Sequence, residues 1–131
     1  MGLEDFDFPI LAISKGSVLT LDSPSEASVG TPKAIASGYF DELLLVDSSG
    51  RAASVTAYES SKVSLLSRLM NKSQSISLTL RRERDMSLQD VRAVIEEHVE
   101  MYPELYSTDN GGLKRRLVDA TEIAQLVDAF R

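Results

Sequence analysis

The chain has 131 residues, of which 43% are hydrophobic and 26% are charged, and its formal net charge is −6. This length and composition are typical of one globular domain that buries its own core, so a single domain over residues 1–131 is expected. The absence of cysteine excludes a disulfide framework, a thiolate zinc site and a cysteine nucleophile.

The N-terminal end carries acids at residues 4, 5 and 7, where a secretory signal would need positive charge. No apolar run approaches the ~18 residues of a membrane span. The sequence therefore predicts a cytoplasmic protein without membrane contact, in which residues 1–8 are a candidate flexible segment. Apolar runs over 9–14 and 18–21 flank a Lys15-Gly16 turn and predict a first β-hairpin.

Two short helical turns are expected next. Ser23 can cap a turn that begins with Pro24, and Thr31 can cap another that runs through residue 36. A second hairpin is expected from the apolar run 42–46, the turn 47–51 and the alternating segment 53–58. The Gly30-Thr31-Pro32 stretch between these elements is expected to be a connector.

Segment 61–70 has weak helical spacing and is left open between helix and strand, whereas the alternation over 75–81 predicts a half-buried strand. The clearest helix begins after Ser87, where Asp90 completes a capping box, and Pro103 ends it. After the break at 110–112, apolar residues predict one or two C-terminal helices, with a new cap near Asp119 or Thr121. The order indicates an α+β fold: a mainly antiparallel sheet of about five strands, with two or three helices, mostly C-terminal, packed on one face.

No catalytic, cofactor-binding or metal-binding residues are expected. His98 is the single histidine, and its place at the edge of an apolar helix stripe indicates a partly exposed surface residue. Phosphate-binding glycine loops are absent, and the adjacent acid pairs are typical of solvated surface. The basic runs at 81–84 and 114–116 lie beside acids and lack interleaved aromatic residues, so nucleic-acid binding is not expected.

The negative charge is confined to the first half of the chain. Residues 1–61 contain nine acids and three bases, while residues 62–131 contain eleven of each. Such a half would attract a basic partner at long range, and the alternative interpretation is that the charge serves solubility alone. The first interpretation predicts a non-catalytic protein-interaction domain with an acidic face. The candidate partner-binding residues are Asp22, Glu26, Asp41, Glu42 and Asp47.

In size, acidity, lack of cysteine and the order hairpin, hairpin, helices, the chain resembles small cytoplasmic bacterial immunity proteins. This resemblance implies a protein that inactivates a cognate toxin by binding it. A second hypothesis is a small-ligand binder or enzyme with a polar cleft of Ser, Tyr and acidic residues, for which Tyr39, Tyr58 and His98 are candidates. A third is a structural subunit that forms a homodimer through a strand edge or the C-terminal helix.

Overall fold

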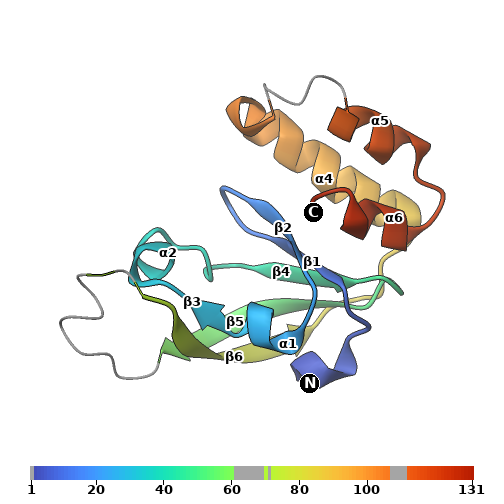
Figure 1. The fold of residues 1–131 in the computed structure, drawn as a ribbon. Coiled ribbons are helices and arrows are strands. Elements are labelled where there is room, and N and C mark those ends of the chain that lie inside the picture. Colours follow the sequence, from blue (N-terminus) through green and yellow to red (C-terminus); the bar gives the residue numbers. More distant parts are fainter. Residues whose placement is uncertain (1, 61–69, 71, 107–111) are drawn as a thin grey trace.

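A computed structural model describes residues 2–60, 70, 72–106 and 112–131. Within these residues, six antiparallel strands form one curled sheet in the order β2-β1-β4-β5-β6-β3 (Figure 1). The strands are β1 (Ile10–Ile13), β2 (Val18–Leu21), β3 (Val29–Gly30), β4 (Leu44–Asp47), β5 (Ala52–Ser60) and β6 (Gln74–Arg82). The predicted α+β class with an antiparallel sheet is confirmed, and both hairpins and the later strand form as expected.

The described residues also form five α-helices and two 3-10 turns. The helices are α1 (Pro24–Ala27), α2 (Pro32–Ala36), α4 (Leu88–Met101), α5 (Gly112–Asp119) and α6 (Ile123–Asp128), and the 3-10 turns are η1 (Leu3–Asp5) and η2 (Pro103–Leu105). The predicted caps at Ser23, Thr31 and Ser87 are confirmed, since each hydroxyl accepts a backbone N–H three residues on. In α6 the N-cap position is Glu122, one residue after the predicted Thr121, and its side chain makes no capping hydrogen bond.

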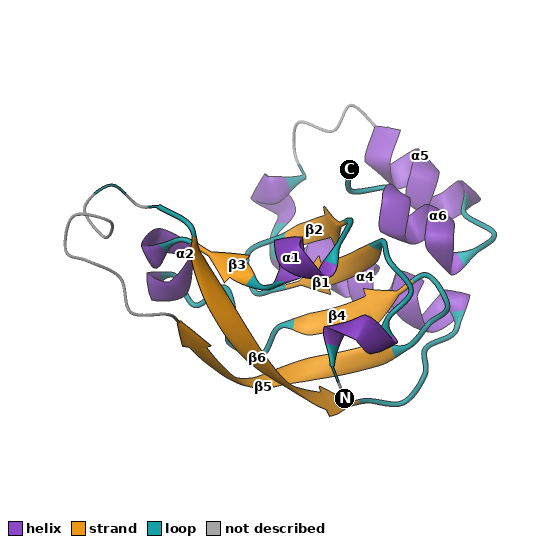
Figure 2. Cartoon of the chain, turned by 60° about the horizontal axis from the view of Figure 1, so that its bottom comes forward, coloured by secondary structure: helices purple, strands orange, loops and turns teal. Residues whose placement is uncertain are grey.

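Strand β3 includes Gly30, which the sequence predicts to lie in a connector. Its two residues pair with β6, Val29 opposite Ser75 and Gly30 opposite Gln74, and a strand this short has no local pattern to reveal it. The pairing explains the curl of the sheet. Strands β2 and β3 lie at opposite ends of the strand order, yet only residues 22–28 join them. Part of this connector is the helix α1, in which each residue advances the chain by only about 1.5 Å. The short connector therefore holds the edge strands β2 and β3 close together (Figure 2).

Two hydrophobic clusters lie on opposite faces of the sheet. Leu11 and Val46 face α4, α5 and α6, which gather together above the sheet in Figure 1. Ile10 and Leu45 face the inside of the curl, where Ile35 of α2 packs against the same cluster. Strands β1 and β4 read as continuous apolar runs because both of their faces are buried. In β6 only the inner face is buried, which explains its clean alternation.

Segment 2–8 packs against this inner cluster. Phe6 is buried, and Leu3 and Phe8 contact the cluster from either side of it. Residues 2–8 thus contribute to the core. The open prediction for segment 61–70 falls on 61–69, which lie outside the described residues.

Candidate functional site

The structure does not place the five predicted acids on one face. Asp22 and Glu26 follow β2 at the end of the sheet where Leu21 pairs with Ile10. Asp41 and Glu42 precede β4 at the other end, where Leu44 pairs with Ile13. Asp47 is fully buried. Asp47 therefore has no surface to offer a partner, and the other four acids form two separate pairs.

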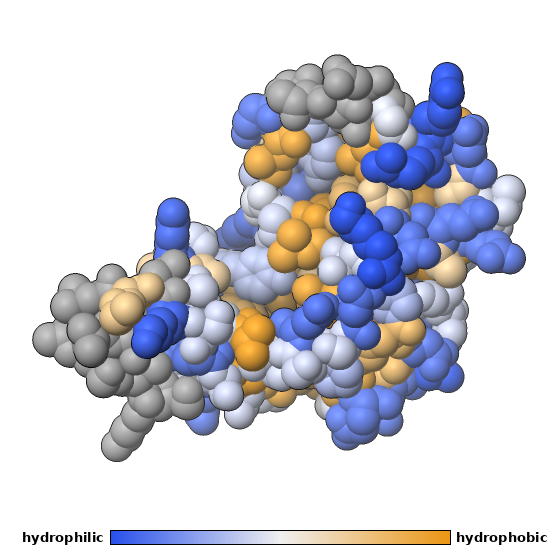
Figure 3. Space-filling model, viewed as in Figure 1, coloured by the Kyte–Doolittle hydropathy of each residue, from blue (hydrophilic) through white to orange (hydrophobic). Residues whose placement is uncertain are grey.

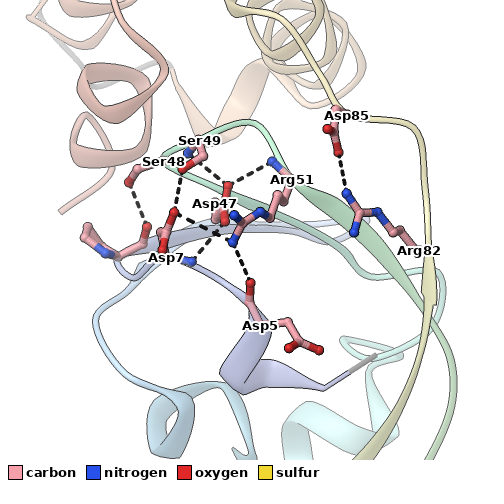
Figure 4. Close-up of polar contacts among 9 residues, drawn as sticks. Asp5, Asp7, Asp47, Ser48, Ser49, Arg51, Arg82 and Asp85 are labelled. Atoms are coloured by element: carbon pink, nitrogen blue, oxygen red, sulfur yellow. Dashed lines mark hydrogen bonds and ion pairs between the residues drawn. The ribbon is translucent and has the colours of Figure 1, made fainter.

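Asp47 is a structural residue (Figure 4). Its Oδ1 accepts the backbone N–H groups of Ser49 and Arg51 at 2.9 and 2.8 Å, and its Oδ2 accepts that of Asp7 at 2.9 Å. A carboxylate that satisfies three amides closes the β4–β5 turn and ties the N-terminal segment to it. It has no free oxygen surface to offer a partner.

The charge of Asp22 is largely offset within the chain. Arg131, from the C-terminal end, places its guanidinium 2.6 Å from Asp22 Oδ1. Glu26 accepts the backbone N–H of Asp22 at 2.5 Å. Pairing with Asp22 also raises the pKa of Arg131, with Asp128 contributing in the same direction. Asp22 and Glu26 both interact within the chain in this way, so they are weaker candidates for binding a partner.

Asp41 and Glu42 line an open hollow of about 630 Å³. One wall is the turn that joins α2 to β4, and the other is the middle of β5 with one residue of β6. The lining residues are Phe40, Asp41, Glu42, Ser54, Val55, Thr56, Ala57, Tyr58 and Arg81. The hollow therefore combines two carboxylates, three hydroxyls and one guanidinium.

The turn that carries the two acids has an unusual backbone. Gly38 has φ +83°, and Glu42 has φ 57°, the one positive value outside glycine among the described residues. Asp41 Oδ1 accepts a hydrogen bond from the Tyr58 hydroxyl at 3.2 Å, which links the turn to β5. Tyr58 also packs on Phe40, with ring centroids 5.3 Å apart. The turn is thus fixed from both sides while its carboxylates stay exposed.

The hollow keeps a negative bias although it contains an arginine. Arg81 donates from Nε and Nη2 to Glu83 Oε1 at 3.1 and 3.0 Å, so its charge is directed at Glu83. Hydrogen bonds from Ser54 and then Arg81 lower the pKa of Glu83, which keeps that carboxylate ionised. Partial burial, followed by the charge and hydrogen bond of Asp41, raises the pKa of Tyr58, so its hydroxyl stays protonated. Neither Asp41 nor Glu42 has a cationic partner among the described residues.

His98 is buried, which corrects the expectation of a partly exposed surface residue. Its Nε2 donates to the Ser14 carbonyl at 3.0 Å, and its Nδ1 lies 2.6 Å from the Tyr106 hydroxyl. Both ring nitrogens are thus used within the chain. Of the three candidates for a polar cleft, only Tyr58 lines the hollow beside Asp41; Tyr39 contacts Phe40, and His98 lines a second groove that Glu42 also borders.

Glu42 is the residue that sequence patterns could not have singled out from its neighbours. A glutamate in the left-handed region is strained, and such strain is common at binding sites. We expect Glu42→Gly to raise the free energy of unfolding by on the order of 0.5 kcal/mol, because glycine removes the strain but adds backbone entropy. Urea denaturation measures the change. Glu42→Gln should show no gain, and an equal gain in both variants would mean that charge repulsion, not φ, is relieved.

Comparison with models of protein families, with curated proteins and with solved structures finds no match. Among the described residues, no three His, Asp or Glu side chains converge to hold a metal ion. Over the same residues, no helix is long and apolar enough to cross a bilayer. The geometry of the hollow therefore provides the basis for a functional proposal.

Proposed function

We propose that this chain is a non-catalytic protein-interaction domain that binds a basic partner protein through the hollow beside Asp41 and Glu42. The observation that carries the proposal is a pair of exposed carboxylates on a fixed turn, without a cationic partner among the described residues. Carboxylates of this kind attract a basic surface at long range and then pair with a lysine or arginine at short range.

The character of the surface supports a polar contact. Hydrophilic side chains spread over the face seen in Figure 3, and apolar side chains form small separate patches between them. The acids of the N-terminal half add to the long-range attraction, since Glu4, Asp5 and Glu59 are also exposed. An immunity or inhibitor role in the cytoplasm, in which the partner is a toxin or an enzyme, is the specific form of this proposal.

A second candidate function has one observation in its favour. A hollow of about 630 Å³ with converging polar groups falls in the size range of small-molecule sites. A small cationic ligand would use the same Asp41, Glu42 and Tyr58. Competition distinguishes the two: free arginine amide that binds as tightly as the partner protein would favour the small-ligand alternative.

The test of the interaction proposal is charge reversal. The partner is first isolated from the source cell by pull-down with mass spectrometry, and its association rate is then measured by stopped flow at several salt concentrations. We expect Asp41→Lys with Glu42→Lys to slow association about 10- to 100-fold at low salt and to flatten the salt dependence.

The matched control changes the net charge equally at a distant place. Glu96 and Glu100 are exposed on α4, and neither is paired with a described residue. Glu96→Lys with Glu100→Lys should slow association much less. Equal slowing by both double variants would mean that only total charge matters, and the hollow would then lose its role.

A further inference from the structure

Strand β5 is longer than β4, one of its two neighbours in the sheet. Strand β4 pairs with β5 only from Ala52 to Ser54, and the Val55 N–H then donates to the Leu43 carbonyl at 2.9 Å. On its other side, β5 is paired with β6 as far as Ser60, opposite Ile76. Beyond Val55, no described residue accepts or donates a backbone hydrogen bond on the β4 side of β5.

The interior strand therefore becomes an edge strand over residues 56–60. In an antiparallel strand, alternate residues point their N–H and C=O groups away from one neighbour and toward the other side. Such a row of free groups is a template for pairing with another chain. Five residues span about 17 Å, enough for a strand of average length.

The hollow lies at the start of this edge. The register of β5 and β6 shifts between Val55 and Ala57, so Thr56 is an extra residue that bends β5. Thr56 and Ala57 are exposed, and both line the hollow together with Asp41 and Glu42. The edge of β5 and two carboxylates that have no cationic partner among the described residues thus open onto the same space.

We infer that the partner contributes an extended segment that adds as a strand along residues 56–60 of β5 and places a lysine or arginine side chain against Asp41 and Glu42. This inference rests on the proposed function and specifies its mode of binding. Main-chain hydrogen bonds to β5 would supply affinity, and the carboxylates would select for a basic side chain. The exposed carboxylate of Glu59, on the same edge, favours a second basic residue further along the segment.

The test uses a defined probe: a fluorescein-labelled peptide, Lys-Val-Lys-Thr-Lys-Val-Lys-Thr, and two derivatives. One derivative is N-methylated on the lysine amides and the other on the Val and Thr amides, so each blocks one edge of the extended peptide. Fluorescence anisotropy measures binding to the full chain and to the variant Asp41→Asn with Glu42→Gln. Hydrogen exchange with peptide bound measures protection of amides 56–60.

We expect the parent peptide to bind with a Kd below about 1 mM, and N-methylation of one edge to weaken binding about tenfold or more, while the other edge tolerates it. The amides within 56–60 that point away from β6 should gain protection, and the Asp41→Asn with Glu42→Gln variant should bind about tenfold more weakly. Absence of binding at 1 mM would overturn strand addition.

The remaining outcomes separate the inference from the function on which it rests. If both N-methylated peptides bind like the parent while the double variant loses binding, the hollow holds a cationic side chain without strand pairing. That result overturns the inference and leaves the proposed function standing. If the double variant binds as tightly as the original chain, the carboxylates do not recognise the cation, and both proposals fail.

Discussion

Asp47→Ala is expected to lower the free energy of unfolding by about 3–4 kcal/mol. The substitution removes a buried carboxylate and leaves the N–H groups of Asp7, Ser49 and Arg51 without an acceptor. A buried donor left unpaired costs about 1–3 kcal/mol, and because these three amides are only partly buried, entry of water reduces the sum. Urea denaturation followed by circular dichroism measures the loss.

Two further variants identify the cause. Asp47→Asn can keep its Oδ1 on Ser49 and Arg51 but faces the Asp7 N–H with an NH2 group, so an intermediate loss is expected. Asp41→Ala, at an exposed carboxylate, should change stability by less than about 1 kcal/mol. If Asp47→Ala were as mild as Asp41→Ala, the three amides would not depend on this carboxylate for stability.

Gly50→Ala is expected to destabilise the fold by about 3 kcal/mol or more. Gly50 has φ +92°, and a Cβ there would collide with the backbone oxygen of Met86. The positive φ alone costs an alanine about 1–2 kcal/mol, and backbone cannot move aside as a flexible side chain can. Met86 also donates its N–H to the Gly50 carbonyl at 2.7 Å, so relief of the clash would break that bond.

Gly16→Ala is the matched control. Gly16 lies in the β1–β2 turn, and a Cβ there meets nothing within 4 Å. Thermal unfolding of both variants should give a change within about 0.5 kcal/mol for Gly16→Ala and a large fall in Tm for Gly50→Ala. Equal effects would show that loss of glycine itself, not the approach to Met86, determines stability.

The denaturation tests show which acids can be changed in the association test without loss of folding. Asp47 is the member of the predicted acidic set that must not be reversed in a binding experiment, because loss of folding would imitate loss of binding. Asp41 and Glu42 can be changed without leaving a buried amide unpaired. The structure thereby determines which acids give an interpretable binding result.

Elements with local signals could be predicted from the sequence. The helix after Ser87 is one: its hydroxyl accepts the Asp90 N–H at 3.1 Å, and the Asp90 carboxylate accepts the Ser87 N–H at 3.0 Å. Both groups lie three residues apart in the chain, so the pattern contains the whole interaction. The two hairpins are predictable for the same reason, since turn residues separate adjacent apolar runs.

The sequence could not predict the burial or pairing of residues whose contacts come from distant segments of the chain. His98 is buried where the Ser14 carbonyl of the first hairpin accepts its Nε2–H, and Asp47 is buried where it accepts the amide of Asp7. The partners lie 84 and 40 positions away, so no periodicity in the sequence reports them. The two residues of β3 are a strand only because β6 lies beside them.

The fold class and the surplus of negative charge that the sequence indicates hold, but fewer acids are available to a partner than the sequence alone indicates. The sequence by itself determined the α+β class, the two hairpins, the caps and the surplus of negative charge in residues 1–61, because composition and local spacing contain that information. Tertiary structure decided which acids are available, since Arg131 offsets Asp22 and backbone amides enclose Asp47. It also set the hollow beside Asp41 and Glu42 against the part of β5 that β4 does not pair, because strand lengths and register exist only once the strands have paired.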